Sequence, residues 1–144
     1  MKDAILLARE AFSQGDIPVG AVIVKDNKII ATGKNRREEK QNALSHAEIE
    51  AINEACEKLG TWRLDNCSLY VTLEPCPMCM GAILNSRISE LVFGAFDLDC
   101  GCADSTVRLG DNVKMSKPEI FGGIYEDECQ KLLKDFFKVV RNRE

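Results

Sequence analysis

Residue types that bind transition metals occur in two short segments of this 144-residue chain. The single histidine, His46, stands two residues before Glu48, and Cys76 stands three residues before Cys79. Two thiolates and one imidazole form a borderline-soft donor set that suits zinc. Three protein ligands leave the fourth tetrahedral position for water, which is typical of a catalytic rather than a structural zinc ion. The pattern therefore predicts a metal centre that activates water.

Glu48 has the chemistry of a proton carrier at such a centre. A zinc ion lowers the pKa of bound water to about 7, so a nearby base can take the proton near neutral pH. A glutamate two residues from the histidine ligand can lie over the open position without binding the metal, and can later return the proton to the substrate. The alternative is a capping role, because Ser45 and Glu48 have capping-box spacing.

Both segments are expected to open helices. Pro77 suits the first turn of a helix that runs to about Ser86, and cysteines three residues apart then lie on one side of that turn. The unpaired N–H groups and the dipole of a helix start favour thiolate over thiol. The capping box predicts that the other helix starts at Ser45 and runs to about Lys58, with Gly60 as its stop.

The rest of the chain predicts an α/β domain. Helical spacing of apolar residues predicts helices over 3–14 and 125–141. The second has an apolar stripe that includes Phe136 and Phe137, which we expect in the core or in dimer packing. β-branched runs predict a hairpin and three further strands, over 20–24, 28–32, 67–72, 91–95 and 119–122. Residues 33–43 and 97–113 are expected to be loops. This order indicates three α/β/α layers with a central mixed sheet of about five strands.

The composition is that of an ordinary globular protein, with 45% hydrophobic and 29% charged residues. It excludes wholesale disorder and fibrous folds, and the length predicts one domain over 1–144. Nineteen Lys and Arg against 23 Asp and Glu give a net charge of -4, so nucleic acid would need a local basic patch. No segment approaches the roughly 18 apolar residues of a membrane span, and no signal peptide is recognisable, so we expect no membrane partner and a cytoplasmic location.

The seven cysteines cannot all pair within one chain, because their number is odd. In a reducing compartment, cysteines are more often metal ligands or buried residues than disulfides. Cys56, Cys67 and Cys129 fall on apolar faces and are expected in the core. Cys100 and Cys102 are too close in sequence for a usual zinc turn. We expect no special function for them, with a reactive or shielded thiol pair as the alternative.

His-x-Glu followed by Pro-Cys-x-x-Cys resembles the signature of the zinc-dependent nucleobase deaminases. From about residue 4 to residue 141 the chain is similar to the bacterial tRNA adenosine deaminases of the cytidine deaminase superfamily. The segments that carry this resemblance are 16–22, 35–36, 46–49, 70–76, 80–83, 86–88, 92–95, 127–129, 132–133 and 136–137.

The resemblance implies a cytidine deaminase-like fold and a zinc-dependent hydrolase. One zinc ion per subunit is then held by His46, Cys76 and Cys79, with Glu48 as the proton shuttle. The implied substrate is the wobble adenosine of a tRNA anticodon stem-loop, which becomes inosine. The resemblance also implies a homodimer with RNA crossing both subunits.

Four further site residues follow from the same resemblance. Asn35 matches a side chain that hydrogen-bonds the extruded base, which suits an amide because it offers both a donor and an acceptor. Ile17 and Leu73 match apolar walls of the base pocket. Asp97 matches an aspartate near the ribose-phosphate chain.

Charge near the implied site has both signs. Residues 96–102 depart from the family pattern, because Asp99 stands where relatives often carry a Lys-Thr-Gly stretch. Two basic segments have the opposite sign. A solvated face is the usual role of such segments, and the alternative is contact with phosphates, which a tRNA substrate would require. One is the last fourteen residues, with five basic and two acidic side chains and a net charge of +3. The other comprises Lys34, Arg36, Arg37 and Lys40.

Two other functions stay open. The first is a deaminase of a free base or nucleoside, such as guanine, cytosine or cytidine, since the segment 75–79 also suits guanine deaminases and the acidic net charge favours a small substrate. The second is a non-catalytic protein with structural zinc. That function needs a fourth ligand, which must be a cysteine or a carboxylate because the chain has one histidine.

Overall fold

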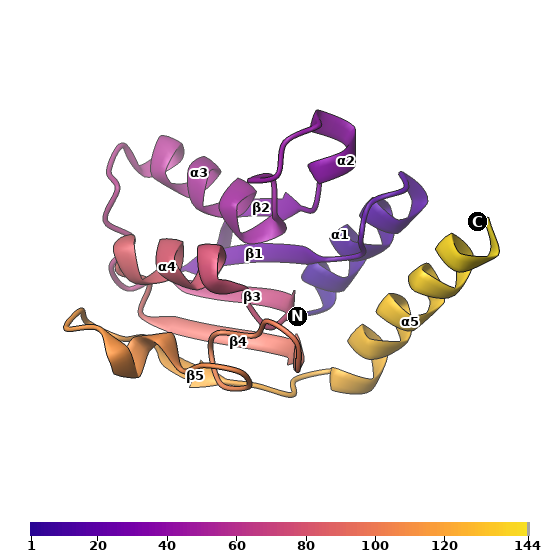
Figure 1. Cartoon of the computed structure of the whole chain (residues 1–144). Helices are drawn as coiled ribbons and strands as arrows, with labels where there is room; N and C mark the ends of the chain where they lie inside the picture. Colours follow the sequence, from indigo (N-terminus) through magenta and orange to yellow (C-terminus); the bar gives the residue numbers. More distant parts are fainter. Residues whose placement is uncertain (144) are drawn as a thin grey trace.

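The computed structural model describes residues 1–143 and shows a five-stranded mixed sheet between two helical layers (Figure 1). Its elements are α1 (Lys2–Ser13), β1 (Gly20–Lys25), β2 (Lys28–Lys34), α2 (Arg37–Lys40), α3 (Ala47–Leu59), β3 (Ser68–Leu73), α4 (Pro77–Asn85), β4 (Glu90–Ala95), the short 3₁₀ helix η1 (Leu109–Asn112), β5 (Glu119–Phe121) and α5 (Glu126–Asn142). The strand order is β2-β1-β3-β4-β5. The three-layer α/β/α prediction is confirmed.

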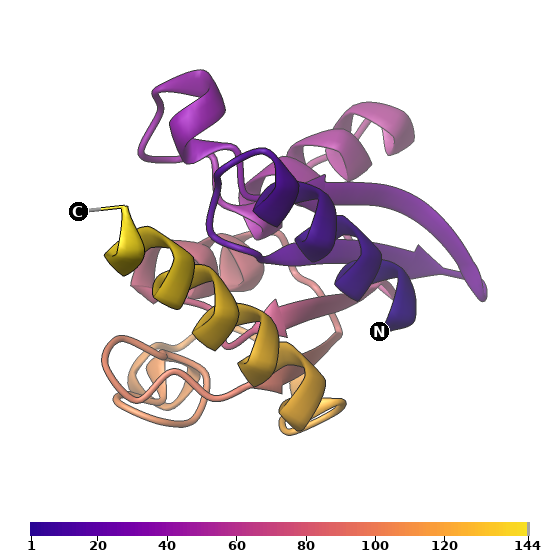
Figure 2. The ribbon, with the colours of Figure 1, turned by 90° about the vertical axis from the view of Figure 1, so that its right-hand side faces the viewer.

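The sheet combines two kinds of pairing. Strand β1 is antiparallel to both β2 and β3, whereas β3, β4 and β5 run parallel to one another. Helices α3 and α4 cover one face, and α1 and α5 lie side by side on the other face (Figures 1 and 2). No helix of the described residues is long and apolar enough to cross a membrane.

At one end of the sheet, the ends of four strands lie beside one another. Because β1 is antiparallel to its neighbours, its amino end lies beside the carboxyl ends of β2 and β3: Gly20 pairs with Lys34, and Leu73 pairs with Ala95 of β4. The segments that meet at this end of the sheet are 17–19, 35–37, 74–76 and 96–100. Ligands of open α/β sheets bind at such carboxyl ends, so the topology indicates where the site lies.

Glycines let the helices lie directly on the strands. A Cβ atom on Gly33 of β2 would collide with the backbone of Ala47 and Ala51 in α3. A Cβ atom on Gly20 of β1 would collide with the backbone of α1 in the same way. The close approach at Gly33 sets the distance between the sheet and the first turn of α3, which follows His46.

We expect Gly33→Ala to lower the free energy of unfolding by about 2 kcal/mol or more, because the added methyl group overpacks the contact between β2 and α3. Urea unfolding followed by circular dichroism measures this change. Gly81 of α4 is the matched control, since a Cβ atom there meets nothing within 4 Å. Gly81→Ala should be neutral or stabilising by up to about 1 kcal/mol, because alanine is the better helix former. Equal stability of the two variants would contradict this account of the packing.

The start of α3 differs from the prediction. The N-cap is His46, without a side-chain cap bond, so the predicted capping box of Ser45 and Glu48 is wrong. Ser45 is buried, and its carbonyl accepts the N–H of Arg36 at 2.9 Å. Glu48 is also buried and lines a cavity. The segment before α2 thus binds the Ser45 carbonyl, and this tertiary contact holds Ser45 outside the helix, one residue before the N-cap.

Residues 33–43 are not only a loop, because β2 extends to Lys34 and α2 follows it. Helix α2 is capped by a distant residue, Asp16, whose side chain is 1% exposed. The Asp16 carboxylate accepts the N–H groups of Glu38 at 2.8 Å and of Glu39 at 3.3 Å. Since Asp16 lies 22 residues before Glu38, no local pattern could predict this cap.

The buried stripe of α5 is narrower than predicted. Phe136 is buried and packs edge-on against Phe12 of α1, with ring centroids 5.4 Å apart. Phe137 is 45% exposed, so it lies outside the core of this chain, and its expected role in dimer packing stays a prediction. Helix α5 contacts β4 on one side and α1 on the other, which leaves the outer part of its apolar stripe uncovered.

Candidate metal centre and base pocket

His46, Cys76 and Cys79 converge at the amino ends of α3 and α4. Their donor atoms lie within 4.8 Å of one another. His46 Nδ1 is 3.6 Å from Cys76 Sγ and 3.5 Å from Cys79 Sγ. A tetrahedral zinc ion with Zn–S near 2.3 Å and Zn–N near 2.0 Å separates nitrogen and sulfur donors by about 3.5 Å. The three side chains therefore fit a zinc ion, and the group has no fourth donor among residues 1–143.

The two thiols have unequal acidity. The pKa of Cys76 is lowered to about 4, chiefly because its sulfur accepts a hydrogen bond from the Cys79 thiol and also because His46 lies beside it. The pKa of the buried Cys79 is raised, because its thiol donates that bond and is desolvated. The pKa of His46 is raised, chiefly by its hydrogen bond to Cys76. The two thiols, Cys76 and Cys79, thus share one proton. Metal binding must release this proton, because both sulfurs bind as thiolates.

Glu48 lies in the first turn of α3 and is not one of the three donors. Its side chain is buried, and burial raises its pKa to about 7. A carboxyl group with a pKa near the working pH can accept a proton in one step and donate it in the next. The environment of Glu48 therefore suits the expected proton shuttle.

A cavity of about 200 Å³ opens beside the three donors. Its lining comprises Ile17, Val19, Asn35, Arg37, His46, Ala47, Glu48, Leu73, Glu74, Cys76, Asp97 and Cys100. The fold thus brings together the four substrate-binding residues expected from the resemblance, Ile17, Asn35, Leu73 and Asp97. They come from segments up to 80 residues apart that meet at the strand ends.

Asn35 is buried at the end of β2, and its position is fixed by two hydrogen bonds. Its backbone N–H donates to the Val19 carbonyl at 3.0 Å, and its side-chain oxygen accepts the N–H of Arg37 at 3.0 Å. This bond orients the amide and leaves its NH₂ group to donate to a ligand in the cavity.

Asp97 closes a turn of its own loop. One carboxylate oxygen accepts the N–H groups of Asp99 at 3.1 Å and Cys100 at 3.2 Å, and the other accepts the Cys100 thiol at 3.1 Å. This hydrogen bond is the main reason that the pKa of Cys100 is raised to about 11. The exposed Cys100 thiol is therefore protonated at neutral pH, which argues against a reactive thiol, and Cys102 is buried.

Most of the basic segment before α3 is neutralised within the molecule. Lys34 pairs with Glu10 at 3.3 Å, Arg36 with Glu39 at 2.6 Å, and Lys40 with Glu50 at 2.9 Å.

Arg37 is different from these three cations. It is exposed, forms no ion pair within residues 1–143, and lines the cavity. The expected patch of four basic residues is thus reduced to one free guanidinium, placed at the pocket. Composition alone did not single it out.

The basic end of α5 retains most of its charge. Lys131 pairs with Asp135 at 2.6 Å. Lys134, Lys138 and Arg141 are exposed, and none forms an ion pair with another described residue. This half of the helix therefore offers a basic surface.

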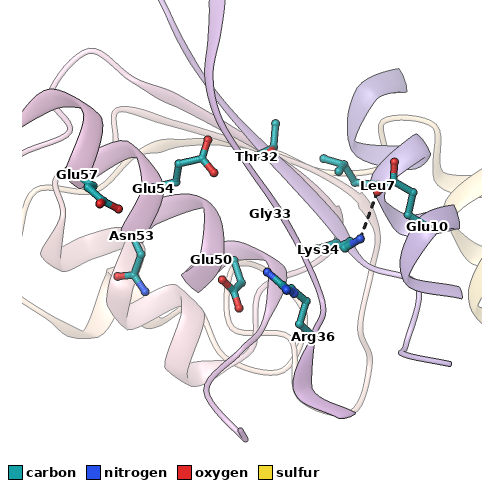
Figure 3. A pocket seen from close by; sticks show the side chains of 10 residues that line it. All are labelled: Leu7, Glu10, Thr32, Gly33, Lys34, Arg36, Glu50, Asn53, Glu54 and Glu57. Atoms are coloured by element: carbon teal, nitrogen blue, oxygen red, sulfur yellow. Dashed lines mark hydrogen bonds and ion pairs between the residues drawn. The ribbon is translucent and has the colours of Figure 1, made fainter. Parts of the chain in front are cut away.

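A larger hollow of about 420 Å³ lies beside the edge strand β2, between α1 and α3 (Figure 3). Four glutamates line it, and the ion pair between Lys34 and Glu10 lies at one end. Its lining contains neither histidine nor cysteine. The smaller cavity is therefore the candidate active site, because only it adjoins the metal donors.

Comparison with known proteins relates the chain to deaminases. The family model of the MafB19-like deaminases matches residues 1–141. The tRNA-specific adenosine deaminase of Bacillus subtilis (strain 168) is 45% identical over 144 residues, which are 99% of this chain and 89% of that protein. That of Rickettsia bellii (strain RML369-C) is 45% identical over 145 residues, with 99% and 100% covered.

Solved structures agree with this relation. A structure from studies of A-to-I editing by tRNA:A34 deaminases at the wobble position of transfer RNA has a TM-score of 0.89 and 41% identity, over 92% of this chain and 97% of that chain. A guanine deaminase from Bacillus subtilis has a TM-score of 0.64 and 33% identity, over 81% and 94% of the two chains.

Proposed function

We propose that this chain, a member of the MafB19-like deaminases and among them of the tRNA-specific adenosine deaminases, converts adenosine to inosine at the wobble position of a tRNA anticodon. The observation that carries this proposal is the 45% identity to two tRNA-specific adenosine deaminases across 99% of the chain. The reaction adds water to C6 of adenine and releases ammonia, so the enzyme is a hydrolase. The chain acts as one catalytic domain.

His46, Cys76 and Cys79 would hold one zinc ion per subunit, since their donor spacing suits it. Bound zinc supplies a Lewis acid that makes water a nucleophile near neutral pH. Glu48 would take a proton from the attacking water and pass it to N1 of the base, and would then carry the proton of the new C6 hydroxyl to the amino group that leaves as ammonia. Its raised pKa supports both steps, because neither protonation state is strongly favoured at pH 7.

The other pocket residues bind and orient the base. Ile17 and Leu73 provide apolar contacts to its faces, and the Asn35 amide donates to its edge. Asp97 also lines the cavity, and on family grounds it lies near the ribose-phosphate chain of the bound nucleotide. The anticodon base is unpaired in its loop, so extruding it into the pocket costs less than extrusion from a duplex.

The proposed partner is the anticodon stem-loop, bound through Arg37 and the basic end of α5. These two features supply positive charge on a chain whose net charge is -4. On family grounds we also propose a homodimer, with RNA crossing both subunits, that works in the cytoplasm.

Arg37→Ala should raise KM for the stem-loop about tenfold, because it removes one charged hydrogen bond worth about 1.5 kcal/mol. The salt dependence of log KM should become shallower by about 0.7 to 1 in slope, as expected for the loss of one phosphate contact. Arg36→Ala is the control, since Arg36 is already paired with Glu39. Equal effects of the two substitutions would assign the phosphate contact to neither residue.

Guanine deamination is the second candidate, because a guanine deaminase is 33% identical to this chain. Zinc-loaded protein should be incubated with an anticodon stem-loop carrying a wobble adenosine and, separately, with free guanine. We expect inosine in the RNA, detected by mass spectrometry of the digested product, and no xanthine. Turnover of guanine without turnover of RNA would replace the proposed function.

A further inference from the structure

A buried carboxylate next to the metal ligands has no part in the chemistry proposed above. Glu74 follows β3, two residues before Cys76, and is 1% exposed. No ion pair within residues 1–143 includes it. Burying a carboxylate without a cation is costly unless hydrogen bonds replace its water. The surroundings of Glu74 must therefore supply donors.

The donors come from one loop, 97–105. One Glu74 oxygen accepts the Asp97 N–H at 3.1 Å and the Ser105 hydroxyl. The other accepts the N–H groups of Ala103 at 3.2 Å, Asp104 at 2.7 Å and Ser105 at 2.8 Å. Both ends of the loop are thus bound to a single carboxylate.

The loop also packs closely around this carboxylate. A Cβ atom on Gly101 would collide with the carboxyl group of Glu74 and with the Asp97 carbonyl. The Gly101 N–H donates to that same carbonyl at 2.9 Å, and the Cys102 N–H donates to the Pro75 carbonyl at 2.8 Å. The loop contains no strand or helix, so these contacts take the place of regular backbone pairing.

The same loop forms one wall of the base pocket. Asp97 and Cys100 line the cavity, and the Asp97 carboxylate binds the backbone and the thiol of Cys100. Glu74 binds the backbone of Asp97. A continuous chain of hydrogen bonds therefore leads from the buried carboxylate to the side chains at the rim of the pocket.

We propose that Glu74 is a positioning residue: its carboxylate holds loop 97–105 so that Asp97 and Cys100 form a fixed wall against the substrate. The inference rests on the proposed function for its effect on catalysis. It does not need that function for its effect on the loop, because the position of the Cys100 thiol can be measured without substrate.

The test uses zinc-loaded Glu74→Gln, which keeps the side-chain size but turns an NH₂ group toward N–H donors. The first measurement is the rate at which iodoacetamide alkylates Cys100, determined by mass spectrometry of the peptide that contains it. We expect an increase of about tenfold, because a released loop no longer holds the thiol on Asp97 and a freer thiol ionises more readily. The second is steady-state kinetics on the stem-loop, where KM should rise more than kcat falls while the zinc content stays unchanged.

Asp16→Asn is the matched control, because Asp16 is equally buried and binds backbone N–H groups of α2 rather than loop 97–105. It should leave Cys100 alkylation within twofold of the wild type. If Glu74→Gln does not fold, Ser105→Ala removes only the hydroxyl donor and should raise alkylation about threefold.

Unchanged alkylation and unchanged KM in a folded, zinc-loaded variant would overturn the proposal. Equal alkylation of Cys100 in Asp16→Asn and Glu74→Gln would also overturn it, because the effect would then be general loosening. Failure of the wild type to deaminate RNA would sink the proposed function alone, since the alkylation measurement still decides whether Glu74 holds the loop.

Discussion

Glu48→Gln is expected to lower kcat for RNA deamination by about 10²- to 10⁴-fold, the usual range for loss of general acid–base catalysis. Glutamine has the shape of the buried glutamate, yet it cannot accept a proton from water and pass it to the leaving ammonia. Ammonia release measures kcat, and atomic absorption measures zinc. The zinc content should stay at one ion per chain, because Glu48 is not among the donors.

The stability of this variant separates catalysis from folding. Burial raises the pKa of Glu48, so its charged form is unfavourable in the folded protein. Replacing it with a neutral amide should therefore leave Tm unchanged or raise it, as happens where active sites retain destabilising groups. Glu57→Gln is the control, because Glu57 lies on the same helix, forms no ion pair within residues 1–143 and is not part of the cavity beside the metal donors. Activity of Glu48→Gln within tenfold of the wild type would show that another group carries the proton.

Cys79→Ala is expected to abolish detectable deamination and to lower the zinc content well below one ion per chain. Two donors remain after the substitution, which is too few for the three-ligand site that a catalytic zinc ion requires. Cys129→Ala is a matched control, since Cys129 is also buried but packs against Gly94 on the other face of the sheet. That variant should keep its zinc and its activity. Full zinc content in Cys79→Ala would remove this residue from the metal centre.

Metal replacement gives a second view of the same site. Chelation should stop ammonia release, and added zinc should restore it. The cobalt-substituted protein should show charge-transfer absorption of two thiolates, in agreement with the donors Cys76 and Cys79. Absorption of three thiolates would indicate a closed structural site, the alternative in which the protein binds rather than catalyses.

Prediction from sequence succeeded where one residue's role depends on near neighbours. The repeat of apolar residues predicted the first and last helices, and β-branched runs predicted the five strands, to within a few residues. It failed at Ser45, whose spacing to Glu48 matched a capping box but whose backbone is bound by Arg36. For Phe137 the helical stripe predicted a place in the core or in a dimer contact, and the exposed ring excludes only the core. Local patterns describe what a segment can do alone, and the error at Ser45 arose from a second segment.

The sequence by itself determined the donor types and spacing that suit zinc, the glutamate beside the histidine, and the alternation of helices and strands. Only the tertiary structure decided which charges are free. Lys34, Arg36 and Lys40 are paired within the molecule, and Arg37 alone of these four stands unpaired at the pocket. Glu74 accepts hydrogen bonds from residues 23 to 31 positions away. Such contacts depend on strand order rather than on neighbouring residues, because the parallel pairing of β3 and β4 brings Glu74 beside a loop distant in sequence.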